Sequence, residues 1–423
     1  MQHRRFGGSK HGPGHQSRSF TDGAGPRAHA SDRQRARVRT GGSDRLQHHG
    51  NGGGFLAEEL LGDASALDLG AAAFILFAIQ GKARACFALL FGVGFGILME
   101  RATAREQNFT AFYLRRMAVL LAIGLFNLSF LFWGDILILY ALLGVALLPF
   151  RRMGNRRLLA LGFGLILVPP LAQGLLELAL GGALPNLAGL SPAQVDALLP
   201  NSVGAYRENS FVGFVAANWR YYLDGWRAHT ADQLVYAASV FGLFSIGLVV
   251  ARNAVFADVE RWRPLLRRTA AWSLPIGIVL SLVQGSRRLG VDLPGPLHAL
   301  PTVAYAGLSI LAFGYIALLC LWLTRGGRRL QPLLAPAGRM ALTGYLGSNA
   351  IGAATFYGWG LATMDRWSAA GLFMFGFAIF TGLCVAASIW LGHFRFGPAE
   401  WLWRSLTYGR AQPMQQRQTE PNG

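Results

Sequence analysis

Asp135 is the residue whose type and position best suit chemistry. It follows Trp133 and Gly134 in a tight turn that joins two apolar segments. A carboxylate at the mouth of a membrane-spanning helix can orient a substrate, relay a proton or pair with a basic group. An aspartate just before an apolar helix can also accept backbone N–H bonds as a helix cap. We therefore predict a catalytic role for Asp135, and we keep capping, alone or in addition, as the alternative.

Lys82 and Arg84 are the next candidates, because they separate two apolar segments. Their charges could bind a phosphate, a carboxylate or a lipid headgroup. Alternatively, their long side chains could reach the membrane interface without binding a ligand. Gly92 and Gly96 follow at a GxxxG spacing, which is typical of closely packed membrane helices rather than of phosphate loops. We retain Lys82 and Arg84 as substrate-binding candidates and predict helix packing for the two glycines.

Basic and aromatic residues near the C-terminal end of the chain form a third group. Arg339 stands at the start of an apolar segment, where it is interpreted as an interface anchor or as a substrate-binding candidate. The last part of the chain combines Trp401, Trp403 and Tyr408 with Arg404. This pattern is typical of an amphipathic segment that lies at the membrane interface. We expect this segment to anchor the chain rather than to bind a ligand.

Side chains that usually serve as bases, nucleophiles or metal ligands are scarce in the apolar segments. Acyl transfer needs a base near the acceptor hydroxyl or amine, but His229, His298 and His393 lie outside or at the edges of these segments. The three cysteines are Cys86, Cys320 and Cys384. They share no metal-ligand spacing and are interpreted as apolar packing residues. We predict no metal site and no cofactor, and the sequence shows no serine-hydrolase, Walker or dinucleotide motif.

The elements that must position these residues are apolar helices. The chain has 423 residues, of which 52% are apolar and 14% are charged, whereas soluble domains carry about 25% charged residues. A helix of about 20 apolar residues crosses a bilayer core of about 30 Å. The sequence therefore predicts an all-α, polytopic transmembrane helical bundle with the lipid bilayer as its partner. The nine predicted spans are 84–99, 113–131, 135–150, 158–180, 234–251, 270–285, 298–323, 340–360 and 369–392.

Arginines between the predicted spans give the bundle an orientation. With nine spans, the arginine-rich connections all fall on one side, and they are 100–116, 151–157, 252–268, 325–339 and the C-terminal tail. Cytoplasmic loops are enriched in Lys and Arg, so we predict a cytoplasmic C-terminus. The other side receives the Asp135 turn and the loops 181–233, 286–297 and 361–368, with Arg287 and Arg288 as the exception. This distribution accounts for much of the net charge of +18, and we predict no nucleic-acid partner.

The N-terminal residues 1–65 differ in composition from the rest of the chain. Residues 1–54 contain six of the nine histidines, ten Lys or Arg and three Asp, without helix or strand periodicity. Such a segment is predicted to be disordered. A basic arm for nucleic acid, a metal-binding histidine cluster and a transit peptide are the alternatives. We favour an altered reading frame or start site, because one more span before residue 67 would return the N-terminus to the cytoplasm.

The chain is predicted to divide into two membrane halves between two tails. The predicted parts are a disordered basic tail over 1–65, an N-terminal half over 66–232 with an outer loop at 181–233, a C-terminal half over 233–413 and a disordered tail over 414–423. The sequence does not define an oligomeric state.

Four motifs, in this order, carry a family resemblance. They read GKARACFALLFGVGFGILMER at 81–101, WGDILILYALLG at 133–144, GRMALTGY at 338–345 and RFGPAEWLWRSLTYGR at 395–410. Over residues 67–413 the sequence resembles the YeiB-like bacterial membrane proteins, family 418 of the domains of unknown function. The resemblance implies ten spans, a location in the bacterial inner membrane and a distant relationship to membrane acyltransferases such as the heparan-glucosaminide acetyltransferase type.

The resemblance also bears on the candidate site. It implies substrate-binding roles for Asn127, Trp133, Arg339 and Tyr345, which lie in or beside the motifs. Family members often carry His where Asn127 stands and Asn where Gly344 stands. They usually begin with a helix that carries a Leu-Asp-x-Leu-Arg-Gly-like start, which this sequence does not contain.

Three functions stay open at this point. The first is transfer of an acyl group from an acyl donor to a glycan, a lipid or a small acceptor, which the resemblance favours. The second is a transporter or channel for a small solute, although the inverted repeats with broken helices that are typical of transporters are not evident. The third is a non-catalytic envelope assembly factor, whose partner would dock on Trp219, Tyr221, Tyr222 and Trp226. The residues alone do not decide whether the chain is an enzyme.

Overall fold

The computed structural model describes residues 65–104, 108–181, 184, 200–286, 293–364 and 366–415. All of these belong to one compact unit of the chain, residues 47–423. Residues 1–64 of the predicted N-terminal tail, Arg287 and Arg288, and residues 416–423 lie outside the described residues. The described residues are helical, apart from connections and an isolated bridge between Phe394 and Gln415. The predicted all-α fold is confirmed.

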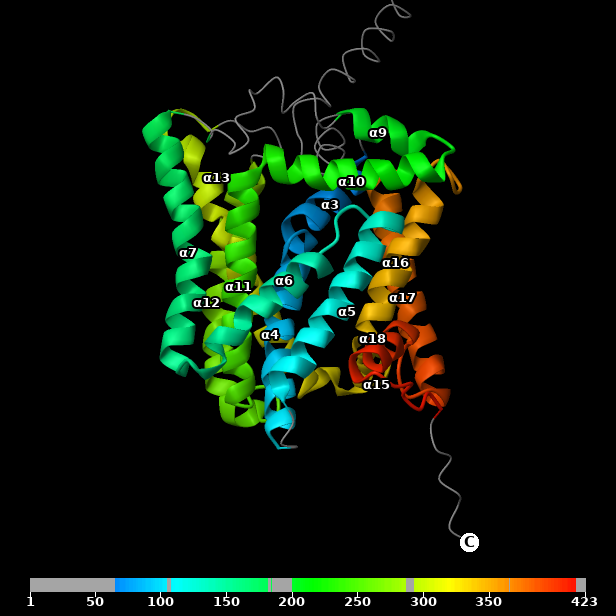
Figure 1. The fold of residues 1–423 in the computed structure, drawn as a ribbon. Coiled ribbons are helices and arrows are strands. Elements are labelled where there is room, and N and C mark those ends of the chain that lie inside the picture. Colours follow the sequence, from blue (N-terminus) through cyan, green and yellow to red (C-terminus); the bar gives the residue numbers. More distant parts are fainter. Residues whose placement is uncertain are drawn as a thin grey trace, which may run out of the picture. The chain divides into compact units, whose positions relative to one another are not determined.

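Figure 1 shows the helices in chain order. They are α3 (Ala66–Phe74), η2 (Ile75–Ile79), α4 (Lys82–Thr103), α5 (Phe109–Phe130), α6 (Leu137–Leu147), η3 (Leu148–Arg152), α7 (Asn155–Leu180), α9 (Pro200–Arg207), α10 (Phe211–Ala228), α11 (Thr230–Arg252), α12 (Val259–Ser286), η5 (Gly295–Ala299), α13 (Leu300–Val303), η6 (Ala304–Ala306), α14 (Gly307–Leu323), η7 (Gly326–Leu330), α15 (Gln331–Arg339), α16 (Ala341–Phe356), α17 (Ala369–His393) and α18 (Pro398–Tyr408).

Seven stretches of the described residues are long and apolar enough to cross a membrane, and they contain 22 to 37 residues each. Each of the nine predicted spans overlaps one helix or, for 135–150 and 298–323, a run of consecutive helices. However, α6 has 11 residues and α16 has 16. At about 1.5 Å per residue, α6 covers roughly 17 Å, which is less than a bilayer core of about 30 Å. The number of spans therefore stays a prediction.

Glycines bring α4 and α11 into close contact. Gly92 lies so near α11 that a Cβ atom there would overlap the carbonyl oxygen of Phe244. From the other side, Gly247 of α11 lies against the carbonyl oxygen of Leu89, and Gly96 meets α11 one turn further along. Small residues allow the backbones of membrane helices to approach in this way. The predicted packing role of Gly92 and Gly96 is confirmed.

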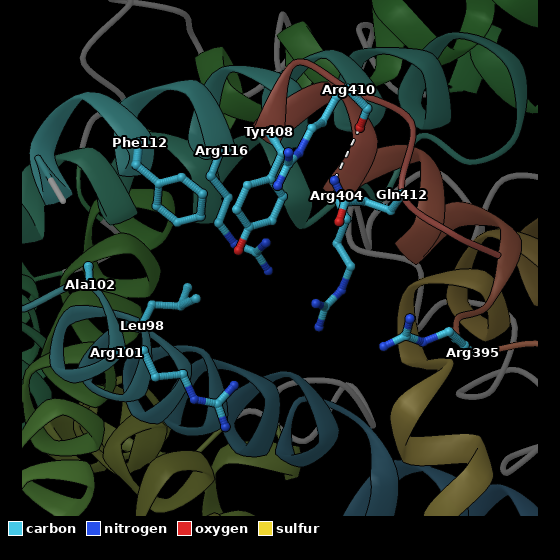
Figure 2. A pocket seen from close by; sticks show the side chains of 10 residues that line it. All are labelled: Leu98, Arg101, Ala102, Phe112, Arg116, Arg395, Arg404, Tyr408, Arg410 and Gln412. Atoms are coloured by element: carbon cyan, nitrogen blue, oxygen red, sulfur yellow. Dashed lines mark hydrogen bonds between the residues drawn. The ribbon is translucent and has the colours of Figure 1, made fainter. Parts of the chain in front are cut away.

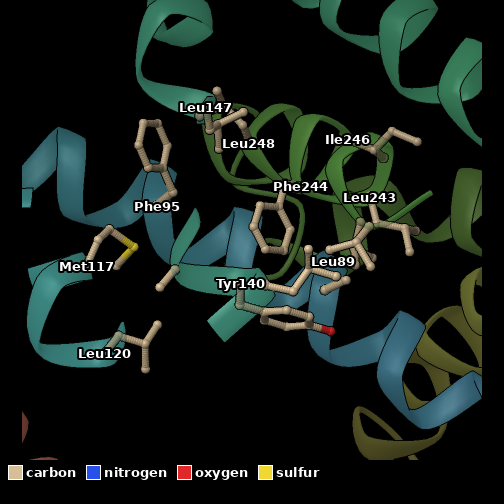
Figure 3. Close-up of a cluster of buried hydrophobic side chains, with 14 of the residues drawn as sticks. Leu89, Phe95, Met117, Leu120, Tyr140, Leu147, Leu243, Phe244, Ile246 and Leu248 are labelled. Carbon is tan, nitrogen blue, oxygen red and sulfur yellow. The ribbon is translucent and has the colours of Figure 1, made fainter. Parts of the chain in front are cut away.

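Buried apolar side chains of α4, α5, α6 and α11 form the main core (Figure 3). Phe244 stacks on Phe91 with ring centroids 4.6 Å apart and meets the Tyr140 ring edge to face at 5.2 Å. The Tyr140 hydroxyl donates a hydrogen bond of 2.7 Å to the carbonyl oxygen of Arg84. The core therefore fixes α4, which carries Arg84, against α6, which begins just after Asp135.

Several arginine-bearing segments meet at one end of the helices. Arg252, the last residue of α11, donates to the carbonyl oxygen of Met153 at 2.7 Å and to Oδ1 of Asn155 at 3.1 Å. Arg115 of α5 donates to the carbonyl oxygen of Thr407 in α18 at 3.5 Å. The first two bonds join the end of α11 to the η3–α7 connection, and the third joins the start of α5 to α18. Arg151 of η3 donates to Thr110 Oγ1 of α5 at 2.5 Å, which links the two pairs. We call this the arginine end, and Figure 1 shows α15 and α18 there.

Two of the sequence motifs join at the arginine end. Glu400 of α18 accepts hydrogen bonds from the backbone N–H groups of Leu342 at 2.7 Å and Thr343 at 3.0 Å. A carboxylate at these free N–H groups caps the start of α16 and suits its dipole. Arg339 donates to the carbonyl oxygen of Arg395 at 3.3 Å. The segments 338–345 and 395–410 are thus held together by specific hydrogen bonds.

Helix α10 covers the other end, which we call the α10 end. It lies across the ends of α5 and α11 and contacts both (Figure 1). Ser210 caps it by accepting the N–H of Gly213 at 3.0 Å, and Trp219 Nε1 donates to Ser129 Oγ on α5 at 3.0 Å. The sequence predicts a loop over 181–233, but 200–207 and 211–228 are helical. An amphipathic helix has too many polar residues to register as an apolar run, which explains the difference.

Candidate functional site

Asp135 lies in the turn between α5 and α6 and is 8% exposed. Its Oδ2 accepts the backbone N–H of Leu137 at 2.7 Å and that of Ile138 at 3.4 Å. These are the first N–H groups of α6, which have no partner within the helix. The predicted capping role of Asp135 is confirmed, and the question is whether the carboxylate has a second role.

Asp135 belongs to a hydrogen-bonded network that links α5 to α16. Asn127 of α5 is fully buried, and its Nδ2 donates to Asp135 Oδ1 and to the Tyr345 hydroxyl, both at 3.4 Å. Asn349 Nδ2 in turn donates to Asn127 Oδ1 at 3.0 Å. Three predicted site residues therefore meet here. The sequence analysis did not single out Asn349, although it follows Tyr345 by four positions and so shares its helix face.

A cavity of about 110 Å³ lies beside this network at the α10 end. Asp135, Trp133 and Arg84 line it, and Tyr222 and Trp226 of α10 supply part of its aromatic wall. At roughly 30 Å³ per water molecule, the space holds about four waters, or the reactive end of a larger ligand. The cavity brings three predicted site residues from α4 and the α5–α6 turn to one place.

Arg84 is held at the cavity by aromatic residues. Its guanidinium carbon lies 4.9 Å from the centroid of the Tyr236 ring, and its carbonyl oxygen accepts the Tyr140 hydroxyl. A planar guanidinium that stacks on a ring keeps its in-plane N–H groups for a ligand. No carboxylate of the described residues forms an ion pair with Arg84. Its positive charge is therefore open to an anionic group of a ligand or to charge that develops during a reaction.

Lys82 and Arg339 do not line this cavity. Lys82 begins α4 and is 1% exposed, and its Nζ donates to the carbonyl oxygen of Leu76 at 3.3 Å. Arg339 lies at the arginine end, where it bonds Arg395. Of the predicted site residues, the structure thus gathers Arg84, Trp133 and Asp135 around the cavity and leaves these two elsewhere.

The aromatic residues of α10 face the bundle. The Tyr221 ring lies 4.2 Å from the Trp133 ring, measured between centroids, and Trp219 bonds Ser129. Tyr222 and Trp226 line the cavity. Burial raises the pKa of Tyr222, so its hydroxyl stays protonated at neutral pH and can donate a hydrogen bond. The docking of a partner on these side chains stays a prediction, because their described contacts lie within the chain.

A second polar cluster, which the sequence analysis missed, lies between α7, α11 and α13. Glu177 is 3% exposed and accepts hydrogen bonds from the Thr302 hydroxyl at 2.7 Å and from Gln173 Nε2 at 3.2 Å. Gln173 Nε2 also donates to Asp232 Oδ1 at 2.8 Å. The signal in the sequence was Gln173 and Glu177 at an i, i+4 spacing inside an apolar segment, where polar residues are costly. The cluster is satisfied internally and does not line the cavity.

The cavity combines a carboxylate, Asp135, that can accept a proton with a guanidinium, Arg84, that carries a positive charge. A carboxylate has about four lone-pair positions, and the described donors to Asp135 are the N–H groups of Leu137 and Ile138 and the amide of Asn127. The N–H of Leu137 contacts both oxygens, Oδ2 at 2.7 Å and Oδ1 at 3.1 Å. A ligand hydroxyl or amine would therefore bond Oδ1 in place of the longer of these two contacts. Arg84 can hold an oxyanion, a carboxylate or a phosphate in the same space.

The membrane-length apolar helices define a multi-pass α-helical membrane protein. Arg84 and Asp135 line its cavity at the α10 end. Residues 250–410 match the family described as "Protein of unknown function (DUF418)". Over these residues the chain is similar to this family.

Three relatives are similar to most of the chain. "Uncharacterized protein YxaH" of Bacillus subtilis (strain 168) is 28% identical over 370 residues, which cover 83% of this chain and 85% of the relative. "Uncharacterized protein YeiB" of Escherichia coli (strain K12) is 26% identical and covers 81% and 85% of the two chains. "Uncharacterized 39.9 kDa protein in amylase 3'region" of Bacillus acidopullulyticus is also 26% identical, with 81% and 84% covered. No solved structure matches significantly.

Proposed function

We propose that the chain is a membrane acyltransferase that moves an acyl group from a thioester donor to a hydroxyl or amine of a glycan, lipid or small acceptor. The observation that carries the proposal is the placement of a buried carboxylate, Asp135, and a guanidinium, Arg84, in one cavity. General base catalysis requires a proton acceptor within reach of the acceptor group. Positive charge fixed near the reacting carbonyl stabilises the negative charge that forms on its oxygen.

In the proposed step, the acceptor proton passes to Asp135 while the acceptor oxygen or nitrogen bonds to the acyl carbonyl carbon. Arg84 faces the negative charge that develops on the carbonyl oxygen. The carbon–sulfur bond then breaks, and the leaving sulfur takes the proton from Asp135 to become a thiol. The carboxylate is thereby restored, and no other reactant is needed.

The proposal is tested with the full-length protein in membrane vesicles that receive radiolabelled acetyl or long-chain acyl thioesters of coenzyme A. We expect wild-type vesicles to transfer label to envelope material. Asp135→Asn removes the base and should lower the rate at least about 100-fold, because general bases contribute about 10²–10⁴-fold. Asn caps helices as well as Asp does, so the fold of α6 should persist.

The matched control is Asp224→Asn. Asp224 is also buried at the α10 end, at 5% exposed, but it pairs with Arg227 at 3.3 Å and does not line the cavity. Its substitution removes the same charge and should leave the labelling rate close to the wild-type rate. Wild-type vesicles without donor-dependent label, or equal rates for wild type and Asp135→Asn, would overturn the proposal.

Transport of a small solute is the second candidate, and one observation favours it. The first membrane-length stretch, Ala66–Ala102, changes from α3 to the π-helix η2 and breaks at Gly81, whose φ is 83°. Transporters bind their solutes at such interruptions. Gly81→Ala would strain this left-handed backbone, and the transport hypothesis expects loss of solute uptake. Uptake that is unchanged when the whole protein is deleted argues against this candidate.

We also infer that the arginine end faces the cytoplasm of a bacterial cell and that the α10 end faces outward across the inner membrane. The excess of arginine at one end supports this orientation. Reporter fusions after Gln415 test it. A reporter that is active only in the cytoplasm should work there, and activity of an exported reporter at the same position would reverse the orientation.

A further inference from the structure

A second cavity, of about 340 Å³, lies at the arginine end. Five arginines line it, and they are Arg101, Arg116, Arg395, Arg404 and Arg410. Figure 2 shows the guanidinium groups of Arg101, Arg116, Arg395 and Arg404 around one open space. We call this the arginine pocket. It is distinct from the Asp135 cavity, with which it shares no lining residue.

Segments that are far apart in the sequence build the arginine pocket. Arg101 comes from the last turn of α4 and Arg116 from α5, whereas Arg404 lies on α18. Arg395 precedes α18 and Arg410 follows it. Arginines that only anchor a chain extend separately toward the interface. Convergence from three helices on one concave space indicates instead a site for a ligand.

Aromatic rings hold two of the guanidinium groups in place. The guanidinium carbon of Arg116 lies 3.6 Å from the Trp403 ring centroid, and Trp403 Nε1 donates to the Arg116 carbonyl oxygen at 3.0 Å. The guanidinium carbon of Arg404 lies 4.5 Å from the Phe396 ring centroid. Stacking fixes the plane of a guanidinium and leaves its N–H edge for bidentate bonds to phosphate. These two arginines are thus oriented before a ligand arrives.

The lining of the pocket carries a net positive charge, which favours the binding of an anion. Its described lining contains no Asp or Glu, so the repulsion among the guanidinium groups has no compensating carboxylate in the wall. Tyr408 and Gln412 also line it and add a hydroxyl and an amide. A volume of about 340 Å³ lies at the lower end of the range for small-molecule sites, about 300–1,000 Å³. The pocket therefore suits a compact anion with several oxygen acceptors.

We propose that the arginine pocket binds a phosphate-bearing ligand, either the headgroup of an anionic lipid or a soluble phosphorylated molecule. Both sources present the same tetrahedral group of anionic oxygens, which several guanidinium groups can contact at once. Arg101, Arg395, Arg404 and Arg410 are exposed, so either source can reach the pocket. The proposal does not depend on acyl transfer, because it concerns the opposite end of the bundle.

The test measures equilibrium binding to the full-length protein in a neutral detergent at one fixed salt concentration. The probes are inorganic pyrophosphate and dioctanoyl phosphatidylglycerol, with dioctanoyl phosphatidylcholine as the zwitterionic comparison. The variant Arg101→Gln with Arg404→Gln should weaken binding at least about tenfold, since each removes charge-assisted hydrogen bonds. Arg101→Gln alone, at an exposed position, should show a smaller loss and serves if the double variant does not fold.

The matched control replaces Arg156 and Arg157 by Gln. Both are exposed, lie at the start of α7 near the arginine end and do not line the pocket. This pair removes the same charge and should bind the probes as the wild type does. Preference for pyrophosphate identifies a soluble ligand, and preference for phosphatidylglycerol identifies a lipid headgroup. The proposal is overturned if neither probe binds better than phosphatidylcholine, or if the control pair weakens binding as much as the pocket pair.

Discussion

The α10 end and the arginine end hold their charged groups in contrasting ways. At the α10 end, a carboxylate that is 8% exposed is held by backbone N–H groups and Asn127 beside a cavity of about 110 Å³. At the arginine end, five guanidinium groups line a cavity of about 340 Å³, and four of them are exposed. The first arrangement suits one fixed reacting group, and the second suits recognition of an anion by several groups together.

Because of this difference, substitutions at the two ends should have effects of different size. At the α10 end, a single substitution removes a reacting group that no neighbouring side chain can replace. At the arginine end, several arginines contact the same anion, so one substitution should weaken binding only in part. Helix α4 connects the two ends, because it carries Arg84 in its first turn and Arg101 in its last. Changes that disturb the packing of α4 should therefore affect both ends, whereas changes of a side chain that lines one cavity should affect only that end.

The largest expected effect is that of Arg84→Gln. Removing one positive group that faces a developing oxyanion lowers rates by about 10²–10³-fold, so acyl labelling should fall by about 100-fold while pyrophosphate binding is kept. Arg84→Lys keeps the charge and should recover part of the rate. Arg227→Gln, at a side chain that is 63% exposed on α10, is the control. A loss of pyrophosphate binding in Arg84→Gln would contradict the expectation that the two ends act independently.

Gly92→Ala is expected to disturb both ends at once. Its Cβ would overlap the backbone of Phe244, and overpacking of this kind costs about 1–3 kcal/mol. Unfolding followed in detergent should show lower stability, together with losses of both labelling and pyrophosphate binding. Gly94→Ala is the control on the same helix, because a Cβ there meets no atom within 4 Å. Equal stabilities of the two variants would contradict the described contact between α4 and α11.

Glu400→Ala should affect the arginine end alone. It removes the cap from the start of α16 and frees α18, which carries Arg404. The loss of a helix cap costs about 0.5–2 kcal/mol, so stability and pyrophosphate affinity should both fall. Glu400→Gln keeps the acceptor oxygen and should retain most of both. Acyl labelling that falls in parallel with binding would show that the ends are coupled through α16, which also carries Tyr345.

The smallest expected effect is a difference in salt dependence between pyrophosphate binding at the arginine end and acyl labelling at the α10 end. When the salt concentration rises from about 0.01 M to about 0.15 M, the screening length falls from about 30 Å to about 8 Å. Pyrophosphate binding at the exposed arginines should weaken several-fold over this range, whereas the labelling rate, which depends on the buried Asp135, should change little. Binding and labelling are measured on the same preparations. Equal salt dependence would place both activities on one surface.

The sequence predicts the helical class well because apolar runs and arginine-bearing connections leave a strong pattern. It does not predict α10, whose residues Trp219, Tyr222, Asp224 and Arg227 read as a polar loop when apolar length is the criterion. The burial of that helix against α5 arises only in the folded bundle, where Trp219 donates a hydrogen bond to Ser129.

The candidate site shows the same limit. The Asp135 turn was identifiable from its local pattern, but its link to Tyr345 runs through Asn127 across 218 positions of sequence, which no local pattern records. Lys82 and Arg84 seemed equivalent in the sequence. Residues two apart on a helix point about 200° away from each other, so Arg84 lines the cavity while Lys82 turns toward Leu76.

The most direct test of the division between the two ends is a pair of measurements on Asp135→Asn. Acyl labelling by membrane vesicles and pyrophosphate binding by purified protein are measured for the same variant. A catalytic carboxylate at the α10 end and an independent phosphate site at the arginine end predict that labelling is lost and binding is kept. Labelling that persists, or binding that disappears together with it, would contradict the account.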